Sequence, residues 1–404
     1  MKTVAILCGG GPAPGINTVV ATVTKVFLKD GYRVLAVHEG YKGLFAEHPE
    51  IEELTYGKAE QIYSRGGSAI KMSRFKPKDE DFNTRLFIQE EIELLVTVGG
   101  DDTASTANRL TKFLADNQVN IKNIHVPKTI DNDLPLPEGI PTFGFTSAKE
   151  MGVSIGKVIK AEAATTQNWY LLMSMGREAG HLAFEIGKGI HASMIIIPEM
   201  FNRTQITIDK VIRLIISSMI KRRILGQKSG VVVVSEGIFH FLKEEDIATS
   251  GISFDYDAHG HPELSEVSKA HVINRILKNR MKQLGLDIIC RPVEVGYSLR
   301  CVDPSAFDLT YCTTLGIGVK KLYEEGHTGC MVAVNLEEEV IPVYLREVED
   351  EHGKIRPRLV NVNKEVVRQT FQENIYYLTE NDRKEAEKWL EYPEEYEYQC
   401  ILGS

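Results

Sequence analysis

Two adjacent carboxylates at the start of a predicted helix form the first group of residues that could do chemistry. Asp101 and Asp102 follow the apolar run 94–98 and the glycines Gly99 and Gly100, and Thr103 can cap the helix that the apolar spacing predicts. Glycines let the backbone approach a phosphate, and a helix start offers free N–H groups. Because two carboxylates would repel a phosphate, we expect a divalent cation, Mg²⁺, at the same place. A turn in which Asp101 or Asp102 only caps the helix accounts for the same residues.

The segment Pro127–Asp133 combines a cation with a carboxylate. It follows a short predicted strand, 123–126. Lys128 suits a transferring phosphoryl group, Asp131 could deprotonate an attacking hydroxyl, and Thr129 can donate to the same oxygens. The alternative is a turn that the Asp and Asn side chains stabilise themselves.

Two further glycine turns could bind phosphate. The turn 9–15, with Gly10 and Gly11, lies between a predicted strand (3–8) and a predicted helix (16–28). The pair Gly66 and Gly67 is followed by the cations Lys71 and Arg74. A turn that only packs a helix and a solvated basic loop are the alternatives.

The second half of the chain repeats the pattern of strand, turn and polar side chain. Met175, Gly176 and Arg177 follow the predicted strand 169–173, and Glu236 follows the predicted strand 231–234. Arg177 could hold a phosphate, and Glu236 could bind sugar hydroxyls. A surface ion pair and a helix cap are the alternatives. Arg291, Tyr297 and Arg300 surround another short strand, a composition suited to a terminal phosphate group.

The elements that must position these side chains alternate between strands and helices, which predicts an α/β fold with a mainly parallel sheet. Loops at the carboxyl ends of neighbouring parallel strands converge on one crevice. We therefore expect the glycine turns and the segment 127–133 to share one site.

Composition limits the class of protein. The 404 residues are 43% apolar with a net charge of −9, and no dense Lys/Arg cluster appears, so we expect no nucleic-acid partner. No apolar run approaches the roughly 20 residues that span a bilayer, so we expect no membrane partner. Six scattered cysteines fit a reducing cytoplasm. His259 and His261 lack further ligand-type neighbours, so we assign no metal to them, and we find no chemistry after about residue 337.

Taken together, these motifs resemble the 6-phosphofructokinase family over roughly residues 3–335. The resemblance implies a two-lobed α/β fold: a phosphoryl-donor and magnesium lobe at 1–143, a sugar-phosphate lobe at 144–298, and a segment 299–404 that returns toward the first lobe and ends in an extension. By position, Asp101 corresponds to the magnesium ligand and Asp131 to the base that activates the 1-hydroxyl of fructose 6-phosphate. The other sugar-phosphate ligands correspond to Thr129, Met175, Gly176, Arg177, Glu236, Arg291, Tyr297 and Arg300. The donor is expected at Gly10, Gly11, Arg74, Gly100 and Thr103.

Two positions indicate the donor. ATP-using members of the family carry glycine where this chain has Asp102 and Lys128. In pyrophosphate-using members the aspartate occupies the place of a nucleotide α-phosphate, and the lysine stabilises the transferring group. A buried carboxylate beside an α-phosphate would cost several kcal/mol, so the sequence favours pyrophosphate. An ATP-dependent or mixed-donor 6-phosphofructokinase is the alternative.

Three departures from ATP-using bacterial members qualify the resemblance. The opening turn is one residue longer, Asn168 replaces an arginine that grips the sugar phosphate across subunits, and Tyr297 replaces a histidine. Since the allosteric effector residues of those members cannot be matched to positions in this chain, we expect no strong allosteric control. The split substrate site of the family implies a homodimer or homotetramer.

Overall fold

The computed structural model describes residues 2–201, 203, 206–242 and 268–403, so His259 and His261 lie outside the described residues. The chain divides into two compact units. Unit 1 comprises Met1–Ala148 and Tyr297–Arg358, and unit 2 comprises Lys149–Gly296 and Leu359–Ser404. Within the described residues, every helix is too short or too polar to cross a lipid bilayer.

Unit 1 is built on an eight-stranded sheet of order β12-β11-β5-β4-β1-β2-β3, with β6 paired to β5. The edge pairs β11–β12 and β2–β3 are antiparallel, and the other pairs are parallel. Its strands are β1 Thr3–Cys8, β2 Arg33–Val37, β3 Ile51–Glu53, β4 Ile92–Gly99, β5 Lys122–Thr129, β6 Phe143–Gly144, β11 Cys330–Val334 and β12 Val340–Tyr344. Its helices are α1 Ile16–Lys29, α2 Gly40–Leu44, α3 Tyr56–Ile62, α4 Arg85–Gln89, α5 Asp101–Asp116, α11 Ala306–Glu324 and α12 Leu345–Val348.

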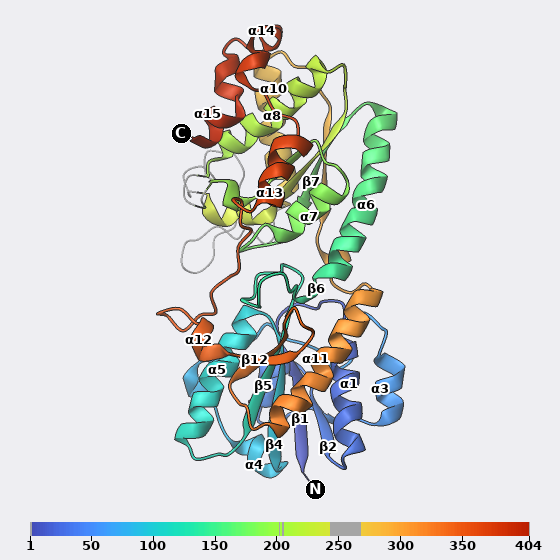
Figure 1. Cartoon of the computed structure of the whole chain (residues 1–404), viewed down its shortest axis with the longest axis vertical. Coiled ribbons are helices and arrows are strands. Elements are labelled where there is room, and N and C mark those ends of the chain that lie inside the picture. Colours follow the sequence, from blue (N-terminus) through green and yellow to red (C-terminus); the bar gives the residue numbers. More distant parts are fainter. Residues whose placement is uncertain (1, 202, 204–205, 243–267, 404) are drawn as a thin grey trace. The chain divides into compact units, whose positions relative to one another are not determined.

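Both faces of this sheet are buried, because successive side chains of a strand point to opposite faces. Val4 and Ile6 of β1 pack in a cluster with residues of α1 and α11. Ala5 and Leu7 pack instead with residues of α2, α4 and α5. Helices therefore cover the sheet on two sides (Figure 1), which leaves the ends of the strands as the place for polar groups.

Unit 2 is built on a four-stranded, fully parallel sheet of order β10-β7-β9-β8. Its strands are β7 Trp169–Ser174, β8 Met194–Ile196, β9 Gly230–Ser235 and β10 Cys290–Val295. Its main helices are α7 His181–Gly189, α8 Ile208–Ile224, α10 Lys269–Gln283, α13 Glu365–Gln369, α14 Arg383–Ala386 and α15 Tyr398–Gly403, with most of α6 Phe145–Thr166. The predicted α/β class with mainly parallel sheets flanked by helices is confirmed.

Two local predictions were wrong. Helix α5 begins at Asp101 with Gly100 as its N-cap, so Thr103 lies inside the helix and does not cap it. The glycine pair lets the chain turn directly from β4 into the helix, three residues earlier than predicted. Strand β5 continues to Thr129 because Gly99 of β4 pairs with Pro127 and Phe143 of β6 pairs with Lys128. Lys128 and Thr129 are therefore strand residues and not loop residues.

Candidate active site

The turn between β4 and α5 places two carboxylates at a helix start. Asp101 and Asp102 are the first two residues of α5, where the helix dipole and free N–H groups favour anions. The side chain of Thr103 fills the space beside the turn: a Cβ on Gly9 would lie 2.6 Å from its Oγ1. The strand end of β1 and the start of α5 thus approach each other only because glycine stands between them.

This close approach predicts the effect of adding a methyl group at Gly99. An ideal Cβ there would lie 2.3 Å from both Cβ and Oγ1 of Thr103, so Gly99→Ala must push the start of α5 away from the sheet. We expect a loss of about 1–3 kcal/mol in the free energy of unfolding, measured by urea denaturation. Gly100→Ala is the matched control, since its Cβ would meet the Lys128 carbonyl oxygen at 3.5 Å, an ordinary contact. Equal losses in the two variants would contradict this account.

Lys128 is the buried cation of unit 1. Its residue is 5% exposed, and its Nζ donates a hydrogen bond to the carbonyl oxygen of Gly11 at 2.6 Å. Burial lowers the pKa of the Lys128 ammonium to about 8; the Arg300 charge adds to this lowering, and the charges of Asp131 and Asp101 oppose it. The structure therefore brings together Lys128, Gly11, Arg300, Asp131 and Asp101, which lie far apart in the sequence.

The turn after β5 carries the carboxylates. The backbone N–H of Asp131 donates to Thr129 Oγ1 at 3.0 Å. Asp133, two residues on, is buried, and its pKa is raised by that burial and by the negative charges of Asp131 and Asp101. Asp133 was not among the residues predicted from the sequence, although it belongs to the Asp-Asn-Asp pattern 131–133.

The carboxylates of unit 1 do not form a complete metal site by themselves. Within the residues that the structure describes, no group of three or more histidine, cysteine or carboxylate side chains could hold a metal ion. Mg²⁺ is commonly held by one or two carboxylates together with waters and substrate phosphates. Asp101 and Asp131 lie close enough to the buried Asp133 for their charges to raise its pKa further, so the oxygen donors here fit a hard cation that arrives with a phosphate.

Asp102 is not buried, contrary to the prediction from the sequence. Its side chain is 45% exposed and its Oδ2 lies 2.7 Å from Lys76 Nζ. As the second residue of α5 it projects from the helix start toward solvent, where Lys76 reaches it. Part of its negative charge is therefore compensated.

The basic segment after Gly66 approaches the opening turn through its backbone. The N–H of Gly10 donates to the carbonyl oxygen of Ser73 at 2.9 Å, which holds the next residue, Arg74, beside the glycine turn. Arg74 itself is exposed. Gly10 and Arg74 are thus neighbours in unit 1.

In unit 2, three strands end side by side. Ser174 of β7 pairs with Ser235 of β9 and with Val295 of β10, so the segments that follow them leave the same edge of the sheet. Ser235 Oγ donates to the carbonyl oxygen of Gly176 at 3.1 Å, and the Met175 N–H donates to the Val295 carbonyl oxygen at 3.2 Å. This edge therefore gathers Met175, Gly176, Arg177 and Glu236.

Glu236 has a partner that the sequence did not reveal. Lys269 Nζ, at the first turn of α10, lies 3.0 Å from Glu236 Oε2, and the two side chains are only 16% and 19% exposed. The pKa of the nearby His240 imidazole is lowered by desolvation and by the charges of Lys269 and Arg177, while Glu178 and Glu236 act in the opposite sense. Charged groups of both signs thus crowd this end of the sheet.

The other predicted sugar-phosphate ligands are Thr129, Arg291, Tyr297 and Arg300, of which only Arg291 belongs to unit 2. Arg291 pairs with Tyr170, near the amino end of its strand, four residues before the edge where Arg177 and Glu236 lie. At about 3.3 Å per residue, the backbone of Arg291 lies more than 10 Å from the strand ends that carry Arg177 and Glu236 in the same chain. Tyr297 and Arg300 belong to unit 1, where the Arg300 guanidinium lies 5.2 Å from the Tyr297 ring centre.

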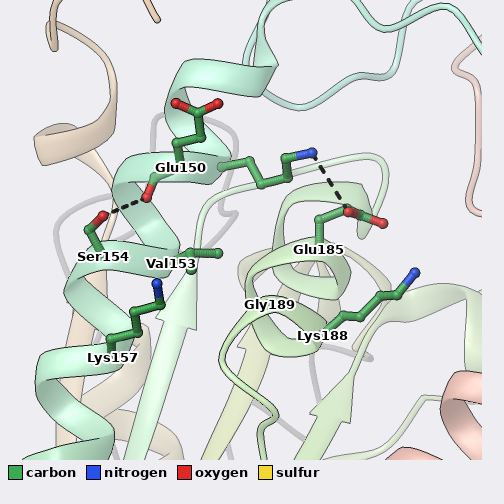
Figure 2. A pocket seen from close by; sticks show the side chains of 8 residues that line it. Glu150, Val153, Ser154, Lys157, Glu185, Lys188 and Gly189 are labelled. Atoms are coloured by element: carbon green, nitrogen blue, oxygen red, sulfur yellow. Dashed lines mark hydrogen bonds and ion pairs between the residues drawn. The ribbon is translucent and has the colours of Figure 1, made fainter.

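A pocket of about 630 Å³ lies in unit 2 beside α6 and α7, away from the predicted residues. Glu150, Val153, Ser154 and Lys157 of α6 line one side of the pocket, and Figure 2 shows Val153 pointing toward α7, whose Glu185, Lys188 and Gly189 line the other side. Lys149 forms an ion pair with Glu185 across it at 3.8 Å. Its rim carries charges of both signs and no predicted site residue.

Comparison with known proteins adds the family context. The phosphofructokinase family profile matches residues 3–323. A protein of Naegleria fowleri named pyrophosphate–fructose 6-phosphate 1-phosphotransferase is 36% identical, over 96% of this chain and 90% of its own length. A protein of the same name from Thermotoga maritima is 34% identical, over 90% and 88% respectively. Relatives named ATP-dependent 6-phosphofructokinase are less similar than these two, at 27% to 29% identity. The crystal structure of a pyrophosphate-dependent phosphofructokinase from Nitrosospira multiformis shares the fold, with a TM-score of 0.70 at 20% identity over 95% of this chain and 90% of that chain.

Proposed function

Because the chain belongs to the phosphofructokinase family, we propose that it transfers a phosphoryl group from pyrophosphate to the 1-hydroxyl of fructose 6-phosphate. The products are fructose 1,6-bisphosphate and phosphate, and the reaction runs in both directions because a phosphoanhydride is exchanged for a phosphate ester without a nucleotide. It serves glycolysis or gluconeogenesis. The observation that carries the proposal is the buried Lys128 ammonium between the glycine turn and the carboxylates, where a short inorganic donor needs a positive charge.

Unit 1 supplies the base and the donor site. Asp131 removes the proton of the 1-hydroxyl, and Lys128 stabilises the charge of the transferring phosphoryl group. Asp102 bounds the donor site. The remaining donor ligands are Gly10, Gly11, Arg74, Gly100 and Thr103.

Mg²⁺ is the cation that we propose for this site, with Asp101 as its protein ligand. Bound there with pyrophosphate, the cation would supply positive charge to the phosphate oxygens. The negative charges of Asp101 and Asp131, which act together on the buried Asp133 carboxyl and raise its pKa, support a cation at this point.

Unit 2 supplies much of the sugar-phosphate site. Arg177 binds the sugar phosphate, and Glu236 accepts hydrogen bonds from sugar hydroxyls in an orientation that Lys269 fixes. The other sugar-phosphate ligands in the proposal are Thr129, Met175, Gly176, Arg291, Tyr297 and Arg300. The position of Arg291 at the far end of β10 favours a role in a neighbouring subunit, and we propose a homodimer or homotetramer.

The setting is a reducing cytoplasm, in which the six cysteines stay free, as they are in the structure. Strong allosteric control is not part of the proposal. A mixed-donor enzyme is the second candidate, because the ion pair of Asp102 with Lys76 weakens the repulsion that would exclude ATP.

An assay of the purified full chain with fructose 6-phosphate and Mg²⁺ tests the proposal. We expect fructose 1,6-bisphosphate to form with pyrophosphate and little to form with ATP. Turnover with ATP and none with pyrophosphate would reject the donor assignment, and comparable rates would establish the mixed-donor enzyme.

The lowered pKa of Lys128 predicts a pH dependence. Since the ammonium loses its proton near pH 8, kcat/KM for pyrophosphate is expected to fall up to tenfold per unit as pH rises above about 8. Bound pyrophosphate favours the charged form, so kcat should hold to higher pH than kcat/KM. Initial rates measured between pH 6.5 and 10 provide the check.

Lys128→Arg is the control for this limb, because a guanidinium stays charged throughout that range. Because a guanidinium differs in shape from an ammonium, the variant is expected to be less active at every pH. Its kcat/KM should, however, no longer fall as pH rises above 8. An unchanged decline in Lys128→Arg would show that another group causes it.

A further inference from the structure

Arg358, the last residue of unit 1, holds the turn that carries Asp131. Its Nε donates to the carbonyl oxygen of Asn132 at 3.2 Å and its Nη1 to that of Ile140 at 2.7 Å, while Nη2 bonds the Asn132 side chain. Its backbone N–H donates to the carbonyl oxygen of Asp133 at 2.6 Å. One residue thus fixes both sides of the segment that follows β5.

The turn needs this support. Asn132 lies in the left-handed region at φ 57°, a conformation that costs free energy for a residue other than glycine. Its Oδ1 accepts the N–H of Thr142 at 3.0 Å as well as the Arg358 bond. Without the guanidinium, the carbonyl oxygens of Asn132 and Ile140 would lose the Arg358 hydrogen bond, and Asn132 Oδ1 would keep only the bond from Thr142.

Glu199 plays the corresponding part in unit 2. It is 5% exposed, and its Oε1 accepts the N–H of Gly180 at 2.9 Å and the N–H of Val360 at 3.1 Å. Gly180 closes the segment 175–180 that carries Arg177. Arg203 Nη2 holds the same segment through Glu178 Oε2 at 2.8 Å.

We propose that Arg358 and Glu199 are positioning residues, and that the stretch Arg358–Val360 is a strap that orders both substrate segments. Arg358 fixes the turn that carries Asp131, and Val360 donates to Glu199, which also accepts from Gly180 at the end of the Arg177 segment. Only Leu359 separates Arg358 from Val360. The C-terminal part of the chain thereby contributes to the site without touching substrate. The kinetic part of this inference rests on the proposed function.

The two anchors should affect different kinetic constants. Arg358→Met is expected to lower kcat at least tenfold with KM for fructose 6-phosphate within threefold, because the base is misplaced. Glu199→Ala is expected to raise KM for fructose 6-phosphate at least tenfold and to leave KM for pyrophosphate within threefold. Glu199→Gln keeps the acceptor oxygen and should restore KM to within threefold of the unaltered enzyme.

Matched controls separate positioning from a general loss of charge. Arg356→Met removes an exposed arginine two residues away, and Glu185→Ala removes a glutamate of α7 outside the site. Both are expected to keep kcat and KM within threefold.

Amide hydrogen exchange on the ligand-free full chain tests the strap without any turnover. Exchange should accelerate in peptides covering 131–142 in Arg358→Met and in peptides covering Gly180 and Val360 in Glu199→Ala. The inference is overturned if the amide exchange rates of these peptides are the same in Arg358→Met as in Arg356→Met and the same in Glu199→Ala as in Glu185→Ala. It is also overturned if Arg358→Met and Glu199→Ala change kcat and KM no more than these two controls do. Absence of pyrophosphate turnover in the unaltered chain would instead count against the proposed function, and the exchange result would still decide the strap.

Discussion

Asp131→Asn is expected to lower kcat by about 10²- to 10⁴-fold, the range that loss of a general base produces. The substitution keeps the shape of the side chain and the backbone bond to Thr129 Oγ1, so the turn should stay folded. KM for both substrates should change little, because an amide can still accept a hydrogen bond from the 1-hydroxyl. Steady-state rates with saturating fructose 6-phosphate and pyrophosphate measure the effect.

Asp116→Asn, at the exposed end of α5, is the control for removal of one carboxylate. It is expected to leave kcat unchanged. The assignment of the base would be wrong if Asp131→Asn kept more than a tenth of the original kcat. Asp133 is not expected to replace Asp131, since burial and the neighbouring charges favour its neutral form.

The central strands of the fold were predicted well, because burial on both faces of a sheet requires apolar side chains along the whole strand. Buried strands such as β1 and β4 appear as continuous apolar runs because helices cover both faces of the sheet. The ends of strands were predicted less well where hydrogen bonds to neighbouring strands determine them. Nothing in Pro127–Thr129 itself reveals that β4 and β6 extend the strand beyond Val126.

The candidate site was predictable to the extent that strand ends converge. Lys128, Asp131 and Asp101 meet because β4 and β5 are neighbours in a parallel sheet, and the order of motifs indicated this arrangement. Arg358 was not predictable, because its partners Asn132 and Ile140 lie more than 200 residues away and no local pattern marks it. Long-range hydrogen bonds of this kind depend on the packed structure.

The exposure of Asp102 also depends on packing, and it changes the expected size of donor discrimination. A carboxylate about 4 Å from an α-phosphate costs about 4 kcal/mol per pair of unit charges at an effective dielectric constant of 20. The ion pair with Lys76 at 2.7 Å offsets part of that cost. Lys76→Met should therefore strengthen the exclusion of ATP by leaving the Asp102 charge uncompensated.

Asp102→Gly should act in the opposite direction, raising kcat/KM for ATP by about 10- to 100-fold, the factor that corresponds to removing about 1.4–2.8 kcal/mol of repulsion. Asp102→Asn separates charge from size: if repulsion is the cause, the amide should recover most of the gain, and if steric contact is the cause, only glycine should. Rates with ATP and with pyrophosphate, measured at several salt concentrations, check the result. Because salt screens an exposed charge, the advantage of pyrophosphate in the unaltered chain should shrink as salt rises. Failure of both substitutions to improve ATP use would mean that another part of the donor site sets the preference for pyrophosphate.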